Sequence, residues 1–180
     1  AEVTLLELTQ AYGIFPRLGR TLKARATLDE KQYESKQVLD PSVAWLMTDM
    51  LSDNEARIPE FGEASPLAFQ YPVAAKTGTT RNSRDNWTLG FTADRIVGVW
   101  VGNADNSPMK GTSGITGAAP IFHDVMDAAM RNLPKTLKPR PATIVEREIC
   151  RTSGLLSTPE CNERMTEYFI RGTEPTTHDT

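Results

Sequence analysis

The chain has 180 residues, of which 39% are hydrophobic and 24% charged, and its formal net charge is −3 at pH 7. This composition is typical of a soluble globular protein, and the small negative charge gives no electrostatic support for binding nucleic acid. No apolar run approaches the about 18 residues of a membrane span, and the first residues lack the pattern of a cleavable signal. The length allows one sizeable core with a small additional lobe.

The first predicted element is a helix that begins after Thr4. Thr4 and Glu7 have the spacing of a capping box, which satisfies free N–H groups at a helix start. Apolar residues then recur at helical spacing until Gly13 and Pro16 end the segment: Leu5, Leu8 and Tyr12. Because the sequence begins at Ala1, without an initiator Met and almost directly at this helix, we expect the chain to be part of a longer protein.

A second helix is predicted from Asp40-Pro41, since Pro suits the first turn of a helix. The side expected to face the core carries Val43, Leu46, Met47, Met50 and Leu51. Residues 53–70 contain two prolines and a glycine, and they are predicted to form a long surface loop.

Three strands are predicted next. Val73 to Thr79 is the first, and an alternating segment at 87–92 and an almost wholly apolar one at 96–101 read as a hairpin across Ala93-Asp94. The expected sheet is antiparallel, in the order 73–79, 87–92, 95–102. Its first strand should keep one edge open, and the first and third helices should cover the sheet.

The third helix follows Pro120 and is expected to direct its apolar residues to the core: Ile121, Phe122, Val125, Met126, Ala129 and Met130. Residues 133–141 hold three prolines and three basic residues and are predicted to be an extended linker. The chain should therefore be an α+β protein, with an antiparallel sheet flanked by helices in residues 1–132 and a small β extension in 142–180.

The extension contains the two cysteines, Cys150 and Cys161, eleven positions apart. This spacing is neither that of a C-x-x-C redox motif nor part of a zinc set. A disulfide, which would stabilise the lobe by roughly 2 to 3 kcal/mol and imply an oxidising compartment, is the simpler interpretation; two free buried thiols are the alternative. His123 and His178 have no partners at ligand spacing, so no metal and no cofactor is expected.

The segment VAAKTGTT, Val73 to Thr80, carries the strongest chemical signal. Lys76 places a cation near the end of a strand, Thr77 adds a hydroxyl, and Gly78 removes a side chain that would keep an extended ligand away from the backbone. Such a strand suits a peptide carboxylate that adds along the edge, and N–H groups at its end can polarise a carbonyl. The tripeptide alone is a weak signal, and an ordinary exposed strand end is the alternative.

Four longer segments extend the pattern: VTLLELTQAYGIF, AAKTGTTRNSRDNWTLGFT, VGVWVGNADNSPM and GAAPIFHDVM. Together they resemble the penicillin-binding proteins, most closely the bifunctional class A type. The resemblance covers about residues 1 to 132, as the C-terminal half of a transpeptidase domain, and FIRGTEP is similar to the C-terminal extension of class A members. It implies the K-T-G motif of a serine acyltransferase that cross-links peptidoglycan stem peptides and binds penicillin.

The resemblance also implies a role for each residue of the motif. Lys76 and Thr77 would bind the terminal carboxylate of a D-Ala-D-Ala stem peptide or of a β-lactam, and Gly78 would let the ligand approach. The Thr79 hydroxyl would bind the same carboxylate, and its N–H would form half of an oxyanion hole. The partners implied are the stem peptide, β-lactams and the upstream half of the same domain, on the extracytoplasmic face of a bacterial membrane, with the parent protein anchored there and this chain soluble.

The family's nucleophile lies in an S-x-x-K motif and is followed by an S-x-N loop. Ser107-Pro108-Met109-Lys110 and Ser52-Asp53-Asn54 match these patterns literally, but their order along the chain is wrong. Ser107 also lies in a turn-rich stretch, where no helix would bring Lys110 beside it. We therefore expect the nucleophile to lie outside this chain, and the chain alone to be inactive.

Two other function classes share the same strand. A β-lactamase or a penicillin-sensing receptor domain would differ by a water-activating base near the serine, in sequence outside this chain. A non-catalytic module would use the strand only to capture a peptide carboxylate. Residues upstream of Ala1 would separate these alternatives.

Overall fold

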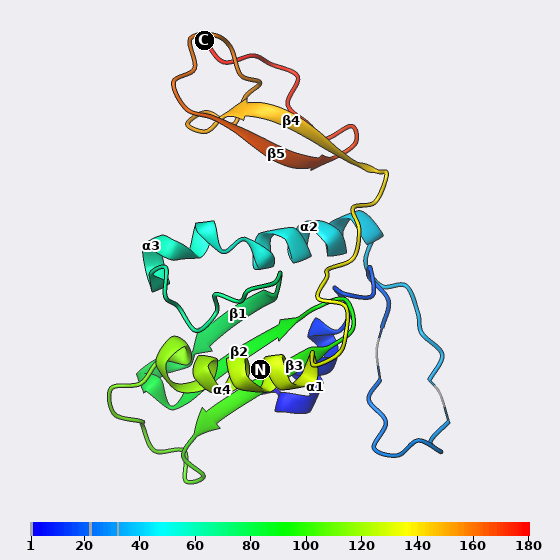
Figure 1. The fold of residues 1–180 in the computed structure, drawn as a ribbon, viewed down its shortest axis with the longest axis vertical. Coiled ribbons are helices and arrows are strands. Elements are labelled where there is room, and N and C mark those ends of the chain that lie inside the picture. Colours follow the sequence, from blue (N-terminus) through cyan, green and yellow to red (C-terminus); the bar gives the residue numbers. More distant parts are fainter. Residues whose placement is uncertain (1, 22, 32) are drawn as a thin grey trace.

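The computed structural model describes residues 2–21, 23–31 and 33–180. The body is built on a three-stranded sheet, and Figure 1 shows a smaller lobe beside it, formed by the end of the chain. The α-helices of the described residues are α1 (Leu5–Tyr12), α2 (Pro41–Ser52), α3 (Ile58–Phe61) and α4 (Ala119–Ala129). Three short helical segments complete the body: η1 (Glu55–Arg57), η2 (Arg81–Ser83) and η3, a π-helix (Gly114–Ala118).

The sheet of the body consists of β1 (Ala74–Thr79), β2 (Asp85–Phe91) and β3 (Ile96–Gly102). Both pairs are antiparallel and the order is β1-β2-β3, so the predicted sheet and hairpin are confirmed. β2 begins two residues earlier than the expected Trp87, because Thr80 N–H donates to the Asp85 carbonyl at 3.0 Å and extends the pairing. The α+β fold class is confirmed.

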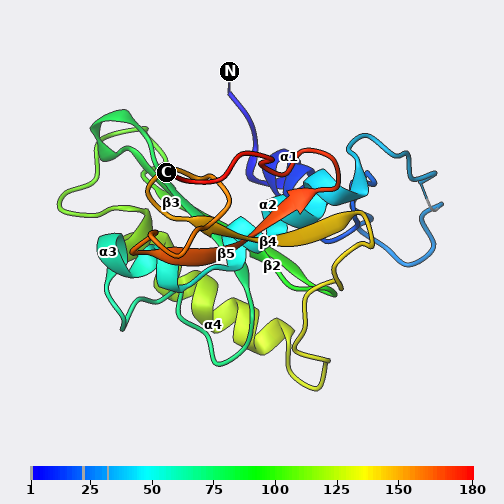
Figure 2. The same cartoon turned by 90° about the horizontal axis from the view of Figure 1, so that it is seen from above.

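Helices α1 and α4 lie on opposite sides of this sheet, as Figure 2 shows from above. Two glycines allow them to pack closely. A Cβ on Gly98 would lie 2.2 Å from Thr9 Oγ1 of α1, and one on Gly90 would lie 2.5 Å from Phe122 Cζ of α4. The sheet is therefore covered by the first and third predicted helices, with most of the buried core on the α4 side.

The helix starts predicted at Thr4 and Asp40 are confirmed. Thr4 Oγ1 accepts from Glu7 N–H at 3.2 Å, and the Glu7 carboxylate accepts from Thr4 N–H at 2.8 Å. Asp40 Oδ1 accepts from Ser42 N–H at 2.8 Å. These bonds satisfy N–H groups that have no partner inside the helix.

The predictions of which side chains of α2 and α4 face the core are only partly right. In α2, Val43 and Met50 are exposed, and the buried residues are Ser42, Ala44, Trp45 and Thr48. The reason is that α2 lies between β1 and the lobe. Small or hydroxylated side chains allow the close approach, and the Trp45 ring is buried by packing against Tyr168. In α4, Phe122, Met126 and Met130 are fully buried, but Ile121 and Val125 are exposed, because only one narrow stripe of the helix faces the sheet.

The prediction of a long surface loop at residues 53–70 is wrong. The segment contains η1 and α3, and Leu67 is only 2% exposed within the core. The Arg57 guanidinium donates to three carbonyls, those of Leu51, Leu67 and Val73. Arg57 thus links the end of α2 to the start of β1. The loop prediction rested on the prolines and the glycine of the segment, and these do not indicate such a contact.

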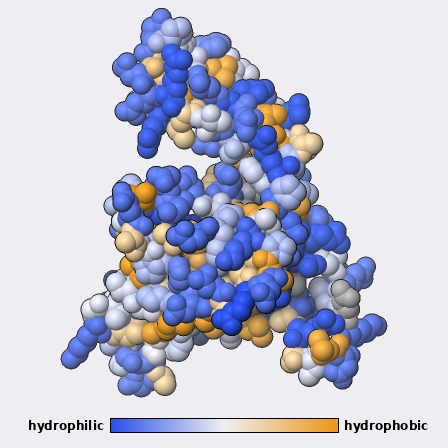
Figure 3. All heavy atoms as spheres, in the orientation of Figure 1, coloured by the Kyte–Doolittle hydropathy of each residue, from blue (hydrophilic) through white to orange (hydrophobic). Residues whose placement is uncertain are grey.

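The lobe consists of β4 (Ile144–Cys150) paired antiparallel with β5 (Arg164–Ile170). An extended segment without helix or strand, residues 134–141, leads into it, and the domain bounds 1–132, 133–141 and 142–180 stay predictions. The recess between lobe and body, visible in Figure 3, is lined mainly by charged residues, among them Asp53, Glu55, Arg151, Glu163 and Arg164. No helix of the described residues is long and apolar enough to cross a membrane.

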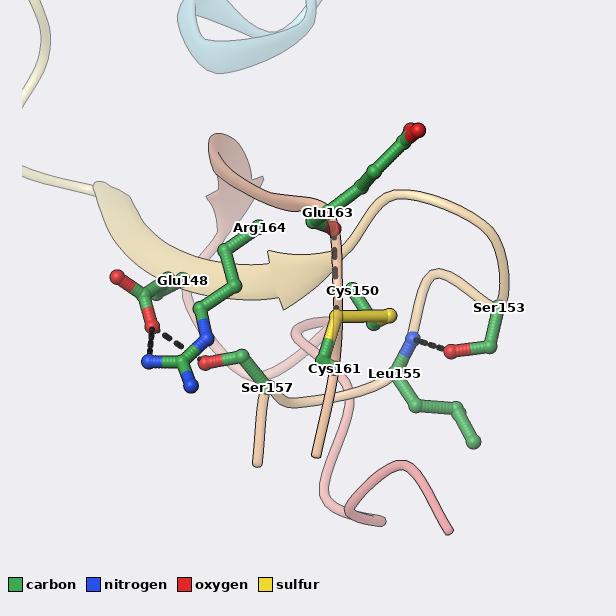
Figure 4. The surroundings of a disulfide bond; sticks show 8 residues. All are labelled: Glu148, Cys150, Ser153, Leu155, Ser157, Cys161, Glu163 and Arg164. Atoms are coloured by element: carbon green, nitrogen blue, oxygen red, sulfur yellow. Dashed lines mark hydrogen bonds and ion pairs between the residues drawn. A yellow bond between two sulfur atoms is a disulfide. The ribbon is translucent and has the colours of Figure 1, made fainter. Parts of the chain in front are cut away.

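The predicted disulfide is confirmed. Cys150 and Cys161 are bonded, with their Cα atoms 5.9 Å apart, and both residues are buried (Figure 4). The bridge joins the end of β4 to the segment that leads into β5. Around it, Ser157 Oγ donates to Glu148 at 2.5 Å and Arg164 lies 3.8 Å from the same carboxylate.

Candidate functional site

The far end of β1 is an open sheet edge. Within the described residues β1 pairs with β2 alone, so its other side has no strand neighbour. Helix α2 and Arg57 cover the start of the strand near Val73, whereas Lys76 and Thr79 farther along are exposed. An extended peptide could therefore add to the second half of β1.

The side chains of the motif alternate between the two faces of the sheet, as in any strand. Lys76 pairs in register with Leu89, and Gly78 with Trp87, on the α1 side. Thr77 and Thr79 face the other side, where a Cβ on Gly114 would lie 3.1 Å from Thr77 Cβ. The two threonine hydroxyls thus share one face, and the lysine lies on the opposite one.

Backbone groups at the edge follow the same alternation. Thr80 N–H donates to the Asp85 carbonyl across the sheet, so the backbone of Gly78, two residues earlier, also points toward β2. The N–H and C=O groups of Thr77 and Thr79 consequently point to the open edge. Lys76 Nζ donates to the Thr77 carbonyl at 2.7 Å, as expected if that oxygen lies at the edge.

Lys76 supplies the positive charge of this edge. Its side chain is exposed, and among the described residues it forms no ion pair within 4.0 Å. Because Nζ reaches the Thr77 carbonyl, the ammonium lies at the edge although the side chain leaves from the α1 face. It is therefore placed to attract an anion that binds along β1.

A groove of about 710 Å³ runs beside these residues on the α1 side of the sheet. Its lining includes Lys76, Thr77, Gly78, Asp85, Trp87, Leu89 and Trp100 from the sheet, and Leu5, Leu8 and Tyr12 from α1. The residues predicted to form the apolar face of α1 thus face the groove, and none of α1 is fully buried. Burial raises the pKa of Tyr12 above its ordinary value.

Asp85 fixes the turn at one end of the groove. Its carboxylate accepts from Thr80 Oγ1 at 3.0 Å and from Trp100 Nε1 at 2.8 Å. The backbone between β1 and β2 also contains Asn82 and Ser83 with positive φ of 63° and 51°. The segment between β1 and β2 is thus held by specific contacts.

On the opposite face, η3 lies over the ends of β1 and β2. Gly114 N–H donates to Thr79 Oγ1 at 2.9 Å, and the Gly114 carbonyl accepts from Thr88 Oγ1 at 3.2 Å. The hydroxyl of Thr79 is therefore held by a segment that lies 35 residues away in sequence.

The two serine motifs set aside in the sequence lie apart from this edge. Ser107 follows β3 in a stretch without helix, and its hydroxyl donates to Asp105 Oδ1 at 2.7 Å. Ser52 ends α2 and donates to the Asp49 carbonyl at 3.0 Å. Neither serine lines the groove beside Lys76.

The histidines and cysteines do not form a metal site in the described residues. The sulfurs of Cys150 and Cys161 lie within 4.8 Å of an Asp179 oxygen, but as a disulfide they offer no thiolate. His123 stacks on Phe69 with ring centroids 4.2 Å apart, and its Nδ1 is hydrogen-bonded to the Pro66 carbonyl at 2.7 Å. His123 thus has a structural contact on the side of α4.

Several residues of the site were not predicted as such: Asp85, Trp87, Thr88, Trp100 and Gly114. The strand alternation could have placed Trp87 and Leu89 on the Lys76 face, once the register of β1 with β2 was known. Nothing in the sequence near Gly114 indicates that it returns to Thr79.

Two family models match the chain. The model described as the penicillin binding protein transpeptidase domain matches residues 1–127, and that of the penicillin-binding protein 1A C-terminal domain matches residues 140–180. Together they cover the body and the lobe.

Similar proteins include penicillin-binding protein 1C of Escherichia coli (strain K12), 30% identical over 98% of this chain, and penicillin-binding protein 1A of Aquifex aeolicus (strain VF5), 32% identical over 97%. The chain spans only 23% and 25% of the length of these two relatives. The crystal structure of penicillin-binding protein 1A from Haemophilus influenzae matches 99% of this chain with a TM-score of 0.75 and 23% identity, and this chain covers 33% of it. That likeness shows the fold.

Proposed function

Because the chain belongs to the penicillin-binding protein transpeptidase family, as a C-terminal part of the class A type, we propose that it completes an enzyme that cross-links peptidoglycan stem peptides by serine acyl transfer. The observation that carries this proposal is the open edge of β1, beside a groove and with a Lys76 ammonium that forms no ion pair among the described residues. A sheet edge with a fixed cation suits an extended peptide that ends in a carboxylate.

In the proposed complex the peptide or β-lactam lies along the second half of β1. The hydroxyls of Thr77 and Thr79 donate to its carboxylate, and Lys76 neutralises the charge from the edge. The outward N–H of Thr79 polarises the carbonyl that is attacked and forms half of the oxyanion hole. Gly78 leaves space for the ligand beside Trp87.

We place the nucleophilic serine and its base in the upstream half of the same domain. Neither Ser52 nor Ser107 approaches the groove, which supports this assignment. The apolar lining from α1 and the tryptophans of β2 and β3 supports a packed protein neighbour at the groove, since such surface is costly to leave in water. The upstream half is therefore both the source of the nucleophile and the main protein partner.

The compartment proposed is the outer face of the bacterial cytoplasmic membrane, with the complete protein anchored there. The names of the similar bacterial proteins and the Cys150–Cys161 disulfide support it, since disulfides persist in oxidising compartments.

The experiment that tests the proposal is the substitution Lys76→Ala in the complete transpeptidase. We expect the rate of acylation by a fluorescent penicillin to fall by about 10²- to 10³-fold, comparable to the loss of one charge-stabilising donor. Arg81→Ala is the matched control, since Arg81 is an exposed cation in η2, past the strand. Equal losses for the two variants would show that the edge acts only as a general basic patch.

A further inference from the structure

The segment η3 approaches the end of β1 unusually closely, on the face opposite the groove. A Cβ on Gly114 would lie 2.8 Å from the Gly78 carbonyl oxygen and 3.0 Å from that of Trp87. Both neighbours are backbone atoms in a paired sheet and cannot move aside cheaply. Gly114 is buried, and only a residue without a side chain fits there.

Two hydrogen bonds pass through the backbone of Gly114. Its carbonyl accepts from Thr88 Oγ1 at 3.2 Å, and its N–H donates to Thr79 Oγ1 at 2.9 Å. Thr88 is fully buried in β2 and pairs in register with Thr77. The bonds thus form a continuous path from the interior of the sheet to the exposed hydroxyl of Thr79.

This path fixes how the Thr79 hydroxyl can act. Because its oxygen accepts from Gly114 N–H, its own proton has to be donated elsewhere. In the part of the chain that the structure describes, no acceptor for that proton is found, and Thr79 is exposed at the open edge. The hydroxyl is therefore held as a donor that is free for a ligand.

Asn86 is the other buried polar side chain of β2 on this face, opposite Thr79 in register. Its amide nitrogen and oxygen have no hydrogen-bond partner among the described residues, although Gly117 of η3 lies against it. The hydroxyl of Thr88 is thus the polar side-chain contact that β2 makes with Gly114.

We propose that Thr88 is a positioning residue for carboxylate binding, which it controls through Gly114 and Thr79 without touching the ligand. The inference rests on the proposed function, because it assumes that Thr79 donates to a substrate carboxylate. The Gly114 carbonyl also accepts from Ala119 N–H at the end of η3, so the Thr88 hydroxyl is the donor that ties this carbonyl to the sheet. Loss of the Thr88 hydroxyl removes that tie, and the η3 backbone is then free to shift relative to β2. A small displacement of Thr79 weakens its bond to the carboxylate.

The test uses the complete transpeptidase and two forms of one penicillin probe, the free carboxylate and its methyl ester. The ratio of their acylation rates, measured on the same sample, reports carboxylate recognition and does not depend on the folded fraction. We expect Thr88→Val to lower this ratio roughly 10-fold, about the effect of one hydrogen bond to a charged group. Thr88→Ser keeps the donor and should leave the ratio within about 2-fold of the parent.

Thr92→Val is the matched control. Thr92 is also a fully buried threonine at the end of β2, but its hydroxyl contacts Met130 Sδ and the turn before β3. It should change stability and leave the ratio unaltered. The double variant Thr79→Ala/Thr88→Val should have the same ratio as Thr79→Ala alone, since Thr88 acts through Thr79.

The outcomes separate the two proposals. If Thr79→Ala lowers the ratio but Thr88→Val does not, or if the two losses add, the positioning role is wrong. If neither Lys76→Ala nor Thr79→Ala affects acylation, the proposed function itself is wrong.

Discussion

Gly78 differs from the other glycines of the sheet in the space around it. A Cβ built there would meet only Trp87 Cβ, at an ordinary contact distance of 3.6 Å. On Gly90 it would lie 2.5 Å from both the Ala74 carbonyl oxygen and Phe122 Cζ. Packing within the described chain therefore requires a glycine at position 90 but not at position 78, where the free space borders the groove.

The substitution Gly78→Ala should consequently separate folding from function. We expect the free energy of unfolding to change by less than about 1 kcal/mol, because Ala is tolerated in a strand at least as well as Gly. Acylation of the complete enzyme by penicillin should fall roughly 10-fold or more, since the methyl group occupies space needed by the ligand. Urea unfolding and the acylation rate provide the two measurements.

Gly90→Ala is the contrasting variant. Its Cβ overlaps backbone and a core ring, so it should destabilise the fold by about 1 to 3 kcal/mol. A large loss of stability in Gly78→Ala, similar to that of Gly90→Ala, would show that Gly78 serves packing.

At the level of single residues, the sequence predicts the K-T-G motif but not the residues that contact it in the fold. Lys76 to Thr79 can be recognised because their chemistry lies within one short segment. Thr88 and Gly114 reach Thr79 only through sheet register and the return of η3, which depend on the tertiary structure. No local pattern predicts those two contacts.

At the level of helices and strands, the predictions of helix starts and of the hairpin turn were right, because the residues that specify these features act directly on the backbone. The caps at Thr4 and Asp40, Pro120 in the first turn of α4 and the hairpin at residues 92–95 all form as predicted. The apolar faces were less predictable, because burial depends on which neighbours a helix has. Met50 of α2 is 64% exposed, whereas Thr48 is buried against the rest of the body.

The lobe also contains an element that was not predicted, β5. Its first three residues, Arg164 to Thr166, are exposed, and the segment lacks the apolar alternation that marks a strand. It forms by pairing with β4. With two strands and few buried side chains, the lobe has a small core for its size.

The disulfide should therefore matter for the lobe in particular. Under non-reducing denaturation neither Cys150 nor Cys161 should react with an alkylating agent, and reduction should add two alkyl groups by mass. Cys150→Ser with Cys161→Ser should destabilise β4 and β5 by roughly 2 to 3 kcal/mol, read by hydrogen exchange of the strand amides. Free thiols in protein matured outside the cytoplasm would contradict the inferred oxidising compartment.

Across the whole molecule, α2 connects the body to the lobe. The hydroxyls of Ser42 and Thr143 are hydrogen-bonded at 2.7 Å, and Trp45 Nε1 donates to the Lys138 carbonyl at 3.2 Å. The Trp45 ring also packs edge-on against Tyr168 of β5, with centroids 5.2 Å apart. Among the described residues, α2 thus contacts both the lobe and the segment that leads into it, next to the charged recess of Figure 3.

Asp49, in helix α2, should make the free energy of unfolding depend on pH. Burial, with smaller contributions from the negative charges of Glu167 and Asp53, raises the pKa of Asp49 in the folded chain. Its ionised form is therefore disfavoured by folding, so the free energy of unfolding falls as the pH rises from about 4, the ordinary value for Asp, through the raised pKa.

Asp49→Asn should stabilise the protein at pH 7, and this gain should be smaller at pH 4, because the raised pKa leaves more of the parent carboxyl protonated in the folded chain than in the unfolded chain. Thermal unfolding at the two pH values measures the effect. Asp124→Asn, at an exposed position of α4, is the matched control for the loss of one carboxylate. If Asp49→Asn stabilised the protein as much at pH 4 as at pH 7, the gain would not come from removing the Asp49 charge.

The central claim, that β1 serves a nucleophile outside this chain, is tested most directly by covalent labelling with a fluorescent penicillin. The chain of 180 residues alone should not label, and the same chain joined to its upstream half should label on a serine outside residues 1–180. Mass spectrometry of the labelled peptide identifies that serine. Labelling of Ser52 or Ser107 in the isolated chain would contradict the account.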